Sequence, residues 1–196
     1  RMLCSRAQLN SRTLRSGTLH TDEWESLSNA ISHLSELPIY IDDTSIISPG
    51  EIRSKCRRLK AQHHELALII IDYLQLMEGG QGSNSNRVEE ISRISRSMKQ
   101  LARELNVPVI ALSQLNRAVE TRQNKRPQLS DLRESGALEQ DADIVLFLYR
   151  DEYYNKDSKD KNTAELIIAK HRNGPTGIIK LFFNLGLTCF ANLSLD

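Results

Sequence analysis

Leu66-Ala67-Leu68-Ile69-Ile70-Ile71-Asp72 is the stretch of sequence that decides the fold. Its apolar residues follow one another without polar alternation, which is typical of a strand buried on both faces of a parallel sheet. Asp72 ends the run. Because it stands at the carboxyl end of a predicted parallel strand, it lies at the edge where open α/β sheets bind ligands. The run therefore predicts an α/β fold with a parallel sheet, and it makes Asp72 a candidate ligand-binding residue.

Helix and strand patterns alternate on both sides of this run. Helical spacing predicts a helix after Thr21, taken as its N-cap, and a second from Pro49 to about His64. A third helix is predicted from Asn86, which stands in capping-box spacing with Glu89. The apolar stripe of this third helix comprises Val88, Ile91, Met98, Leu101 and Leu105.

Further strands complete the pattern. A short strand is predicted at 39–41, and buried strands are predicted at 108–112 and 144–149. The C-terminal part predicts strands joined by turns at 164–169, 178–183 and 189–193. Alternation followed by hairpins predicts an α/β fold, in which helices flank a mostly parallel sheet with an antiparallel C-terminal hairpin region. A length of 196 residues suits one domain, which we expect over 1–196.

Composition limits the classes of function. The chain is 39% apolar and 26% charged, as ordinary soluble globular proteins are. Its formal net charge is only +1, so any affinity for nucleic acid must come from a local patch. No apolar run is long enough for a membrane span, and no leader pattern suggests secretion. The three cysteines show no metal-ligand spacing, which favours free thiols in a reducing, cytoplasmic setting.

Asp72 is the first candidate site residue. A carboxylate at this edge of a sheet can help to hold Mg²⁺ on the β- and γ-phosphates of a nucleotide. An aspartate that merely ends a strand or caps the next turn gives the same pattern, and apolar runs ending in aspartate are common. Taken alone, Asp72 leaves both interpretations open.

Gln114 is the second candidate. It follows the predicted strand at 108–112, and its amide can both donate and accept hydrogen bonds, as a sensor of a γ-phosphate would need. The next segment, 115–133, contains five cations and two acids and so carries a net charge of +3. A basic loop that leaves a nucleotide-sensing edge could couple hydrolysis to a polyanion. A solvated surface loop is the alternative.

Two further motifs carry cations. In Leu132-Arg133-Glu134-Ser135-Gly136, the fork of Arg133 suits a phosphate, and Gly136 lets backbone N–H groups approach the same strand. Glu134 alone favours a structural salt bridge. The segment is poor in aromatic residues, so it predicts contacts to a nucleic-acid backbone with little sequence preference.

Lys170 and Arg172 are two residues apart on a predicted strand, so they project from one face. Asn173-Gly174 is a turn signal that places both near a hairpin tip. Cations in such a place could reach the triphosphate of a neighbouring subunit. They could equally be edge-strand charges that discourage aggregation.

In combination and in this order, "IIIDYLQLM", "ALSQLNRAVE", "LRESGALEQDADIV" and "AKHRNGPTG" resemble the C-terminal motor domain of DnaB-type replicative DNA helicases. The resemblance covers essentially the whole chain. It implies a RecA-like P-loop NTPase fold, the cofactors ATP and Mg²⁺, and a homohexameric ring that moves along single-stranded DNA and unwinds duplex at the replication fork. Primase and a helicase loader are the further partners implied for the whole protein, and no membrane is involved.

Residue by residue, the resemblance implies a role for each motif. Asp72 matches the Walker B carboxylate that serves Mg²⁺, and Gln114 matches the glutamine that senses the γ-phosphate. The loop that grips DNA in the central channel is matched by Arg133, Glu134 and Gly136. Lys170 and Arg172 match the cations that reach the neighbouring subunit's ATP. The segment 79–86 corresponds in position to the second loop of the channel.

One departure from the family's pattern bears on activity. None of the nine glycines is followed by lysine, so the Gly-x-x-x-x-Gly-Lys-Ser/Thr phosphate loop is absent from these residues. The family's catalytic glutamate is missing too, and the chain begins with Arg1, as a fragment would. We therefore expect these 196 residues alone to bind ATP poorly and hydrolyse essentially none. The alternatives are another RecA-like ATPase and a non-catalytic module that binds single-stranded DNA.

Overall fold

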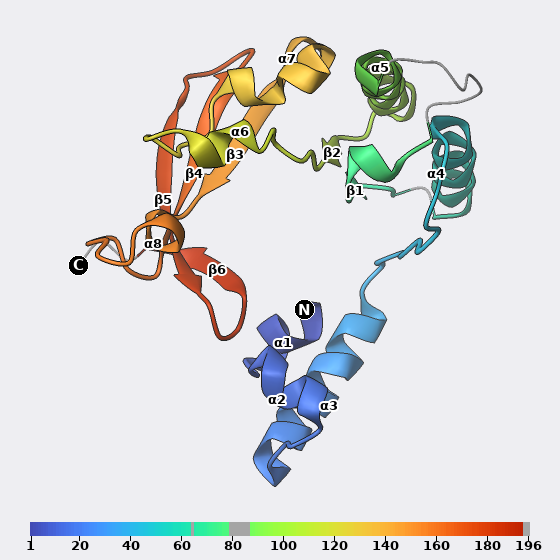
Figure 1. Ribbon diagram of the computed structural model, residues 1–196. Helices are drawn as coiled ribbons and strands as arrows, with labels where there is room; N and C mark the ends of the chain where they lie inside the picture. Colours follow the sequence, from blue (N-terminus) through green and yellow to red (C-terminus); the bar gives the residue numbers. More distant parts are fainter. Residues whose placement is uncertain (64, 79–86, 194–196) are drawn as a thin grey trace. The chain divides into compact units, whose positions relative to one another are not determined.

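The computed structural model describes residues 1–63, 65–78 and 87–193, except for the side chains of 133–135 (Figure 1). Contacts within the chain define two compact units. One unit comprises Arg1–Asp42, Leu148–Ile167 and Ile178–Asp196, and the other comprises Asp43–Phe147 and Ile168–Gly177. That the whole chain forms one domain stays a prediction.

The elements follow one another as the labels of Figure 1 show. The helices are α1 (Met2–Ala7), α2 (Ser11–Ser16), α3 (Thr21–Glu36), α4 (Pro49–His63), α5 (Arg87–Leu105), α6 (Ala118–Thr121), α7 (Gly136–Asp141) and α8 (Asp151–Tyr154). The described residues also form the 3₁₀ helices η1 (Leu74–Leu76) and η2 (Leu129–Ser135). The strands are β1 (Ile69–Ile71), β2 (Val109–Ala111), β3 (Ile144–Tyr149), β4 (Thr163–His171), β5 (Gly177–Asn184) and β6 (Cys189–Asn192).

The described strands form two sheets. β1 and β2 pair in parallel, with Ile69 opposite Val109 and Ile71 opposite Ala111. The other sheet has the strand order β3-β4-β5-β6, and β5 and β6 run antiparallel. The predicted C-terminal strands are therefore confirmed, with slightly different bounds, and so is the hairpin of β5 and β6.

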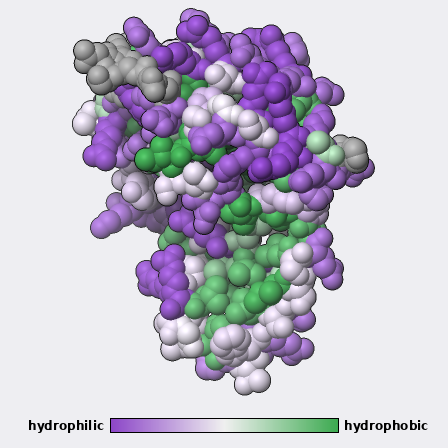
Figure 2. Space-filling view, turned by 90° about the vertical axis from the view of Figure 1, so that its right-hand side faces the viewer, coloured by the Kyte–Doolittle hydropathy of each residue, from purple (hydrophilic) through white to green (hydrophobic). Residues whose placement is uncertain are grey.

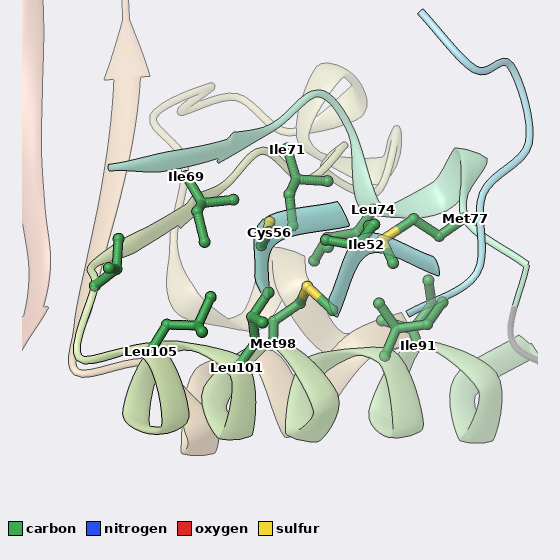
Figure 3. Close-up of a cluster of buried hydrophobic side chains, with 12 residues drawn as sticks. Ile52, Cys56, Ile69, Ile71, Leu74, Met77, Ile91, Met98, Leu101 and Leu105 are labelled. Atoms are coloured by element: carbon green, nitrogen blue, oxygen red, sulfur yellow. The ribbon is translucent and has the colours of Figure 1, made fainter. Parts of the chain in front are cut away.

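Helix α5 provides the main core of its unit. Its acids Glu89 and Glu90 lie in the first turn and Arg103 in the last, which complements the helix dipole. The apolar stripe expected from the sequence is buried except for Val88, which is 38% exposed. Figure 3 shows this stripe facing β1 and α4. The cluster comprises Ile52, Cys56, Ile69, Ile71, Leu74, Met77, Ile91, Ile94, Met98, Leu101, Leu105 and Val107.

Truncating Leu101 tests this core. The side chain is 1% exposed, so Leu101→Ala removes buried methyl groups and leaves a cavity beneath β1. We expect the free energy of unfolding to fall by about 2–5 kcal/mol. Urea unfolding measures the change. Arg93→Ala, on the exposed face of α5, is the control and should change stability by no more than about 0.5 kcal/mol. Equal stability of the two variants would contradict this account of the core.

The core strands differ from the prediction in one respect. The sequence predicts that β1, β2 and β3 are buried on both faces, but Ile70 is 62% exposed, Ile110 49% and Leu146 52%. Side chains alternate along a strand, and among the described residues α4 and α5 cover only one face of β1. The prediction of two buried faces is therefore wrong for the described chain.

Two local predictions are also wrong. Residues 39–41 form no strand, because they have no ladder partner among the described residues and Ile41 is 82% exposed. Helix α3 is capped by His20 rather than Thr21, since the His20 backbone N–H donates to Glu23 Oε2 at 2.9 Å and a capping box forms. The expected cap at Asn86 lies outside the described residues.

The unit that holds α1 and α3 has its own small core, which includes Cys4, Leu27 and Ala30. In the view of Figure 2, apolar side chains form a patch on the surface turned toward the viewer. Ile31 and Leu37, at the end of α3 and just beyond it, are among the exposed apolar residues of this unit. No helix in the described ranges combines the length and hydropathy needed to cross a bilayer.

Candidate functional site

The candidate site begins at the shared carboxyl edge of β1 and β2. The parallel register places Ile71 beside Ala111, so Asp72 and Gln114 follow their strands at the same edge. Two main-chain hydrogen bonds extend the pairing beyond the strands. Leu112 N donates to Ile71 O at 2.9 Å, and Leu74 N donates to Leu112 O at 3.0 Å. Asp72 and Gln114 therefore both follow strands that end at one edge of this sheet.

Asp72 is exposed, and the chain bends at this residue before η1 begins. Among the residues that the structure describes, its carboxylate makes no hydrogen bond or ion pair. Mg²⁺ in nucleotide sites is commonly held by one or two carboxylates together with phosphates and water. An exposed carboxylate without a protein partner fits that kind of ligand.

Gln114 is exposed as well, and within the described ranges its side-chain amide makes no hydrogen bond. Its backbone, in contrast, is held by Gln75, which reaches across from η1. Sequence reasoning did not identify Gln75, and no spacing rule would have found it. The contact depends on how η1 folds back over the end of β2.

Lys170 lies near the end of β4, and its ammonium is held by the end of helix α7. Nζ donates to the carbonyls of Glu139, Gln140 and Ala142, the last at 2.8 Å. A cation at the carboxyl end of a helix is stabilised by the helix dipole and by the otherwise unsatisfied carbonyls. In this structure Lys170 therefore contacts its own chain.

Arg172 contacts the turn between α7 and β3. Its Nη1 lies 2.9 Å from Asp143 Oδ1, and its backbone N–H donates to Asp143 O at 2.8 Å. The hydrogen bond from Lys99 holds the pKa of Asp143 below its usual value, and the charge of Arg172 adds to this effect. Asp143 therefore stays ionised beside the two cations. Its role was not found from the sequence.

Lys170 lies on β4, as predicted, but Arg172 follows the last residue of β4 and belongs to the turn, so the prediction that both lie on the strand is wrong for Arg172. Both side chains nevertheless contact the segment around the end of α7. The side chain of Arg172 is still 46% exposed. It borders a concave site of about 240 Å³ whose other lining residues are Arg96, Lys99, Gln100, Arg103, Gln140 and Asp141. Contact with a neighbouring subunit stays a prediction.

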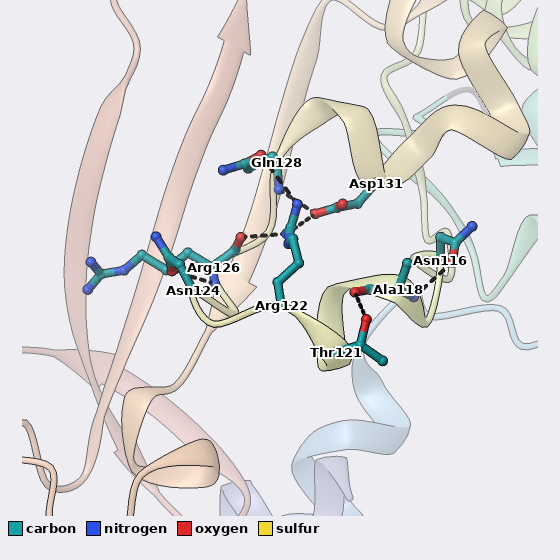
Figure 4. A network of polar contacts seen from close by, with 8 residues as sticks. All are labelled: Asn116, Ala118, Thr121, Arg122, Asn124, Arg126, Gln128 and Asp131. Atoms are coloured by element: carbon teal, nitrogen blue, oxygen red, sulfur yellow. Dashed lines mark hydrogen bonds and ion pairs between the residues drawn. The ribbon is translucent and has the colours of Figure 1, made fainter.

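Part of the basic segment 115–133 has an internal role, which Figure 4 shows. Arg122 Nη2 donates to Asp131 Oδ2 at 2.7 Å and to Arg126 O at 3.0 Å. The backbone of Gln128 also donates to Asp131 Oδ2, at 2.8 Å. Because the pair of Arg122 and Asp131 is neutral, the net charge of +3 over the segment resides on the remaining residues.

Arg122 is expected to stabilise this segment. Asp131 is 8% exposed, so Arg122→Met leaves a buried carboxylate with one fewer charged donor. We expect a loss of about 1–3 kcal/mol in the free energy of unfolding. Urea unfolding of this variant, of Asp131→Asn and of the double variant measures the coupling, which should make the two losses less than additive. Arg117→Met, at an exposed position, is the control, and strict additivity would contradict the role of the pair.

The structure describes only part of the loop predicted to contact DNA, which comprises Arg133, Glu134 and Gly136. The backbone of Arg133 and Glu134 belongs to η2, and their side chains lie outside the described residues. Gly136 has the ordinary helical φ of −50°, so its conformation does not require glycine. A Cβ at this position would meet no atom of the described chain within 4 Å. The open space leaves room for a close external partner, and contact with DNA stays a prediction, as does any role of 79–86, which is not described.

Comparison with known proteins adds a family to this geometry. The profile of the DnaB-like helicase C terminal domain family matches residues 1–192. The chain is similar to the replicative DNA helicase DnaB of Geobacillus stearothermophilus, with 58% identity over 98% of this chain, and to the replicative DNA helicase DnaC of Bacillus subtilis, with 56% identity over 98%. The chain spans 42% of the length of these two relatives.

Two solved structures share the fold. One, described as an ATPase domain, superimposes with a TM-score of 0.94 at 47% identity, covering 98% of this chain and 69% of that one. A DnaB-like replicative helicase, described with its interactions with primase, gives the same TM-score and identity over 98% of this chain and 46% of its own. The expected RecA-like α/β fold is therefore confirmed.

Proposed function

The chain belongs to the DnaB-like helicase C-terminal domain family, and from this membership we propose that it is part of the ATP-driven motor of a replicative DNA helicase. The whole protein would move along single-stranded DNA and unwind duplex at the replication fork. One observation carries the proposal at the level of chemistry. Asp72 and Gln114 share one sheet edge, and neither side chain has a partner among the described residues.

The proposed roles at this edge follow from the chemistry of the two side chains. The carboxylate of Asp72 would hold the Mg²⁺ that accompanies ATP, and this ion neutralises part of the phosphate charge when bound. Gln114 would donate a hydrogen bond to the γ-phosphate and lose it after hydrolysis. The loss would be relayed to the basic segment that begins at residue 115.

Lys170 and Arg172 would serve the nucleotide of the next subunit in a ring of six. Support for this comes from their place beside the turn that follows β4 and from the exposure of the Arg172 side chain. Planar guanidinium forks suit phosphate oxygens, and a cation supplied in trans stabilises charge on a transferring phosphoryl group.

The loop of Arg133, Glu134 and Gly136 would lie against single-stranded DNA, where Arg133, backbone N–H groups and the cations of the basic segment would contact the phosphates with little sequence preference. We also propose that the whole protein meets primase, as the primase interaction described for one similar helicase suggests, and a helicase loader. Cys4, Cys56 and Cys189 are not joined in disulfides in the described structure, which suits the reducing cytoplasm proposed for the protein.

Strand displacement by the whole protein is the direct test. ATP and Mg²⁺ together should release the labelled strand of a forked duplex, and omission of either should stop release. A whole protein that hydrolyses ATP but never separates strands would instead favour another RecA-like ATPase.

A second candidate is a module that binds single-stranded DNA without catalysis. The absence of a Gly-Lys dipeptide from these 196 residues favours it for the chain in isolation. It predicts salt-sensitive binding that ATP does not alter, measured by fluorescence anisotropy of a labelled oligonucleotide. ATP hydrolysis by these residues alone would exclude it.

A further inference from the structure

Gln75 joins the two halves of the candidate nucleotide edge. It lies in η1, three residues after Asp72, and its side chain crosses to the end of β2. Its Nε2 donates to Ser113 Oγ at 2.9 Å and lies 3.4 Å from Gln114 O. Its Oε1 accepts the backbone N–H of Gln114 at 3.2 Å. One side chain therefore holds both backbone polar groups of Gln114.

The main chain of Gln75 is fixed independently. Arg87, the first residue of α5, donates from Nη2 to Gln75 O at 2.6 Å and is itself paired with Glu90. The preceding residue, Leu74, is 1% exposed and bonds to Leu112 O through its backbone N–H at 3.0 Å. Gln75 thus starts from a rigid base, so its side chain can transmit a defined position to Gln114.

An amide is the group that this place requires. Gln114 N–H needs an acceptor, and Gln114 O can take a donor, so only a side chain with both can serve the two at once. Leucine has a similar size but neither function, and a glutamate carboxylate would only accept. The identity of residue 75 therefore matters as much as its size.

We propose that Gln75 is a positioning residue that holds Gln114 in place to meet the γ-phosphate. This rests on the proposed function, since Gln114 must act as the sensor for its position to matter. Gln75 does not touch the nucleotide in this scheme. Its effect passes through the backbone of Gln114, so it should govern how well the sensor works once ATP is bound rather than how tightly ATP binds.

Steady-state ATP hydrolysis by the full-length protein with single-stranded DNA tests the proposal. Gln75→Leu should lower kcat about tenfold, which corresponds to the loss of roughly one well-placed hydrogen bond, with KM for ATP within about threefold. Ser113→Ala removes only one of the bonds and should lower kcat about threefold. Gln62→Leu, the same change at an exposed position of α4, should leave kcat unchanged.

The combination with Gln114→Ala separates positioning from a general structural role. If Gln75 acts through Gln114, then Gln75→Leu/Gln114→Ala should hydrolyse ATP as fast as Gln114→Ala alone. A further tenfold loss in the double variant, or an unchanged kcat in Gln75→Leu, would overturn the proposal. If Gln75→Leu proves unfolded, Ser113→Ala takes its place. In that case Ser113→Ala/Gln114→Ala should hydrolyse ATP as fast as Gln114→Ala alone, and a further loss would overturn the proposal.

Failure of the proposed function looks different in this experiment. A wild-type protein that does not hydrolyse ATP would remove the function and the inference together. Normal hydrolysis by Gln114→Ala would reject the sensing role of Gln114 and with it the positioning role of Gln75. The helicase proposal would be unaffected by that result and is tested separately by strand displacement. A strong loss in Gln114→Ala with no loss in Gln75→Leu would reject the inference alone.

Discussion

Asp72→Asn is expected to lower ATP hydrolysis by the full-length protein about a hundredfold or more, because a neutral amide replaces the carboxylate proposed to hold Mg²⁺ on the phosphates. The substitution keeps the size and shape of the side chain. Phosphate release at saturating ATP, with single-stranded DNA present, measures the effect. Because the missing ligand serves the metal ion, higher Mg²⁺ concentrations should recover part of the rate.

The position of Asp72 makes this a clean experiment. The side chain is exposed and has no protein partner among the described residues, so Asp72→Asn should shift the melting temperature by no more than about 2 °C. Asp43→Asn, another exposed aspartate, is the matched control and should hydrolyse ATP normally. Normal hydrolysis and unwinding by Asp72→Asn would contradict the metal-binding role.

The sequence was sufficient to place Asp72 and Gln114 together. Two apolar runs, each ending in a polar residue, imply neighbouring parallel strands, and parallel strands end at the same edge. The paired register of Ile71 and Ala111 has this arrangement. A local sequence pattern can identify these two residues because each is a polar residue that closely follows an apolar strand.

The partners of these residues could not be predicted in the same way. Gln75 contacts Gln114 because a 3₁₀ turn folds back over β2, and Asp143 contacts Lys99 and Arg172 across different elements. Such choices depend on tertiary packing rather than on spacing. The exposure of Ile70 was missed for a related reason, since an apolar run does not reveal how many layers cover a strand.

Arg172→Ala is expected to lower ATP hydrolysis by the full-length protein about a thousandfold, the lower end of what a guanidinium supplied in trans contributes to phosphoryl transfer. The fold should persist, because Asp143 keeps its ion pair with Lys99. Arg172→Lys should recover little of the rate, since an ammonium lacks the planar fork. Phosphate release at saturating ATP measures each variant. Near-normal hydrolysis by Arg172→Ala would reject the catalytic role. The alternative, a surface charge that discourages aggregation, would then remain.

Mixing two inactive variants shows whether Arg172 acts across subunits. In a ring, an Arg172→Ala subunit still carries Asp72, and a neighbouring Asp72→Asn subunit still carries Arg172. Their shared interface therefore holds one intact copy of each group. If equal amounts of the two variants exchange at random in a closed ring, about a quarter of all interfaces should be of this intact kind. The mixture should therefore regain hydrolysis that neither variant shows alone. If Arg172 served its own subunit's nucleotide, no mixture could place both groups at one site, and activity would stay lost.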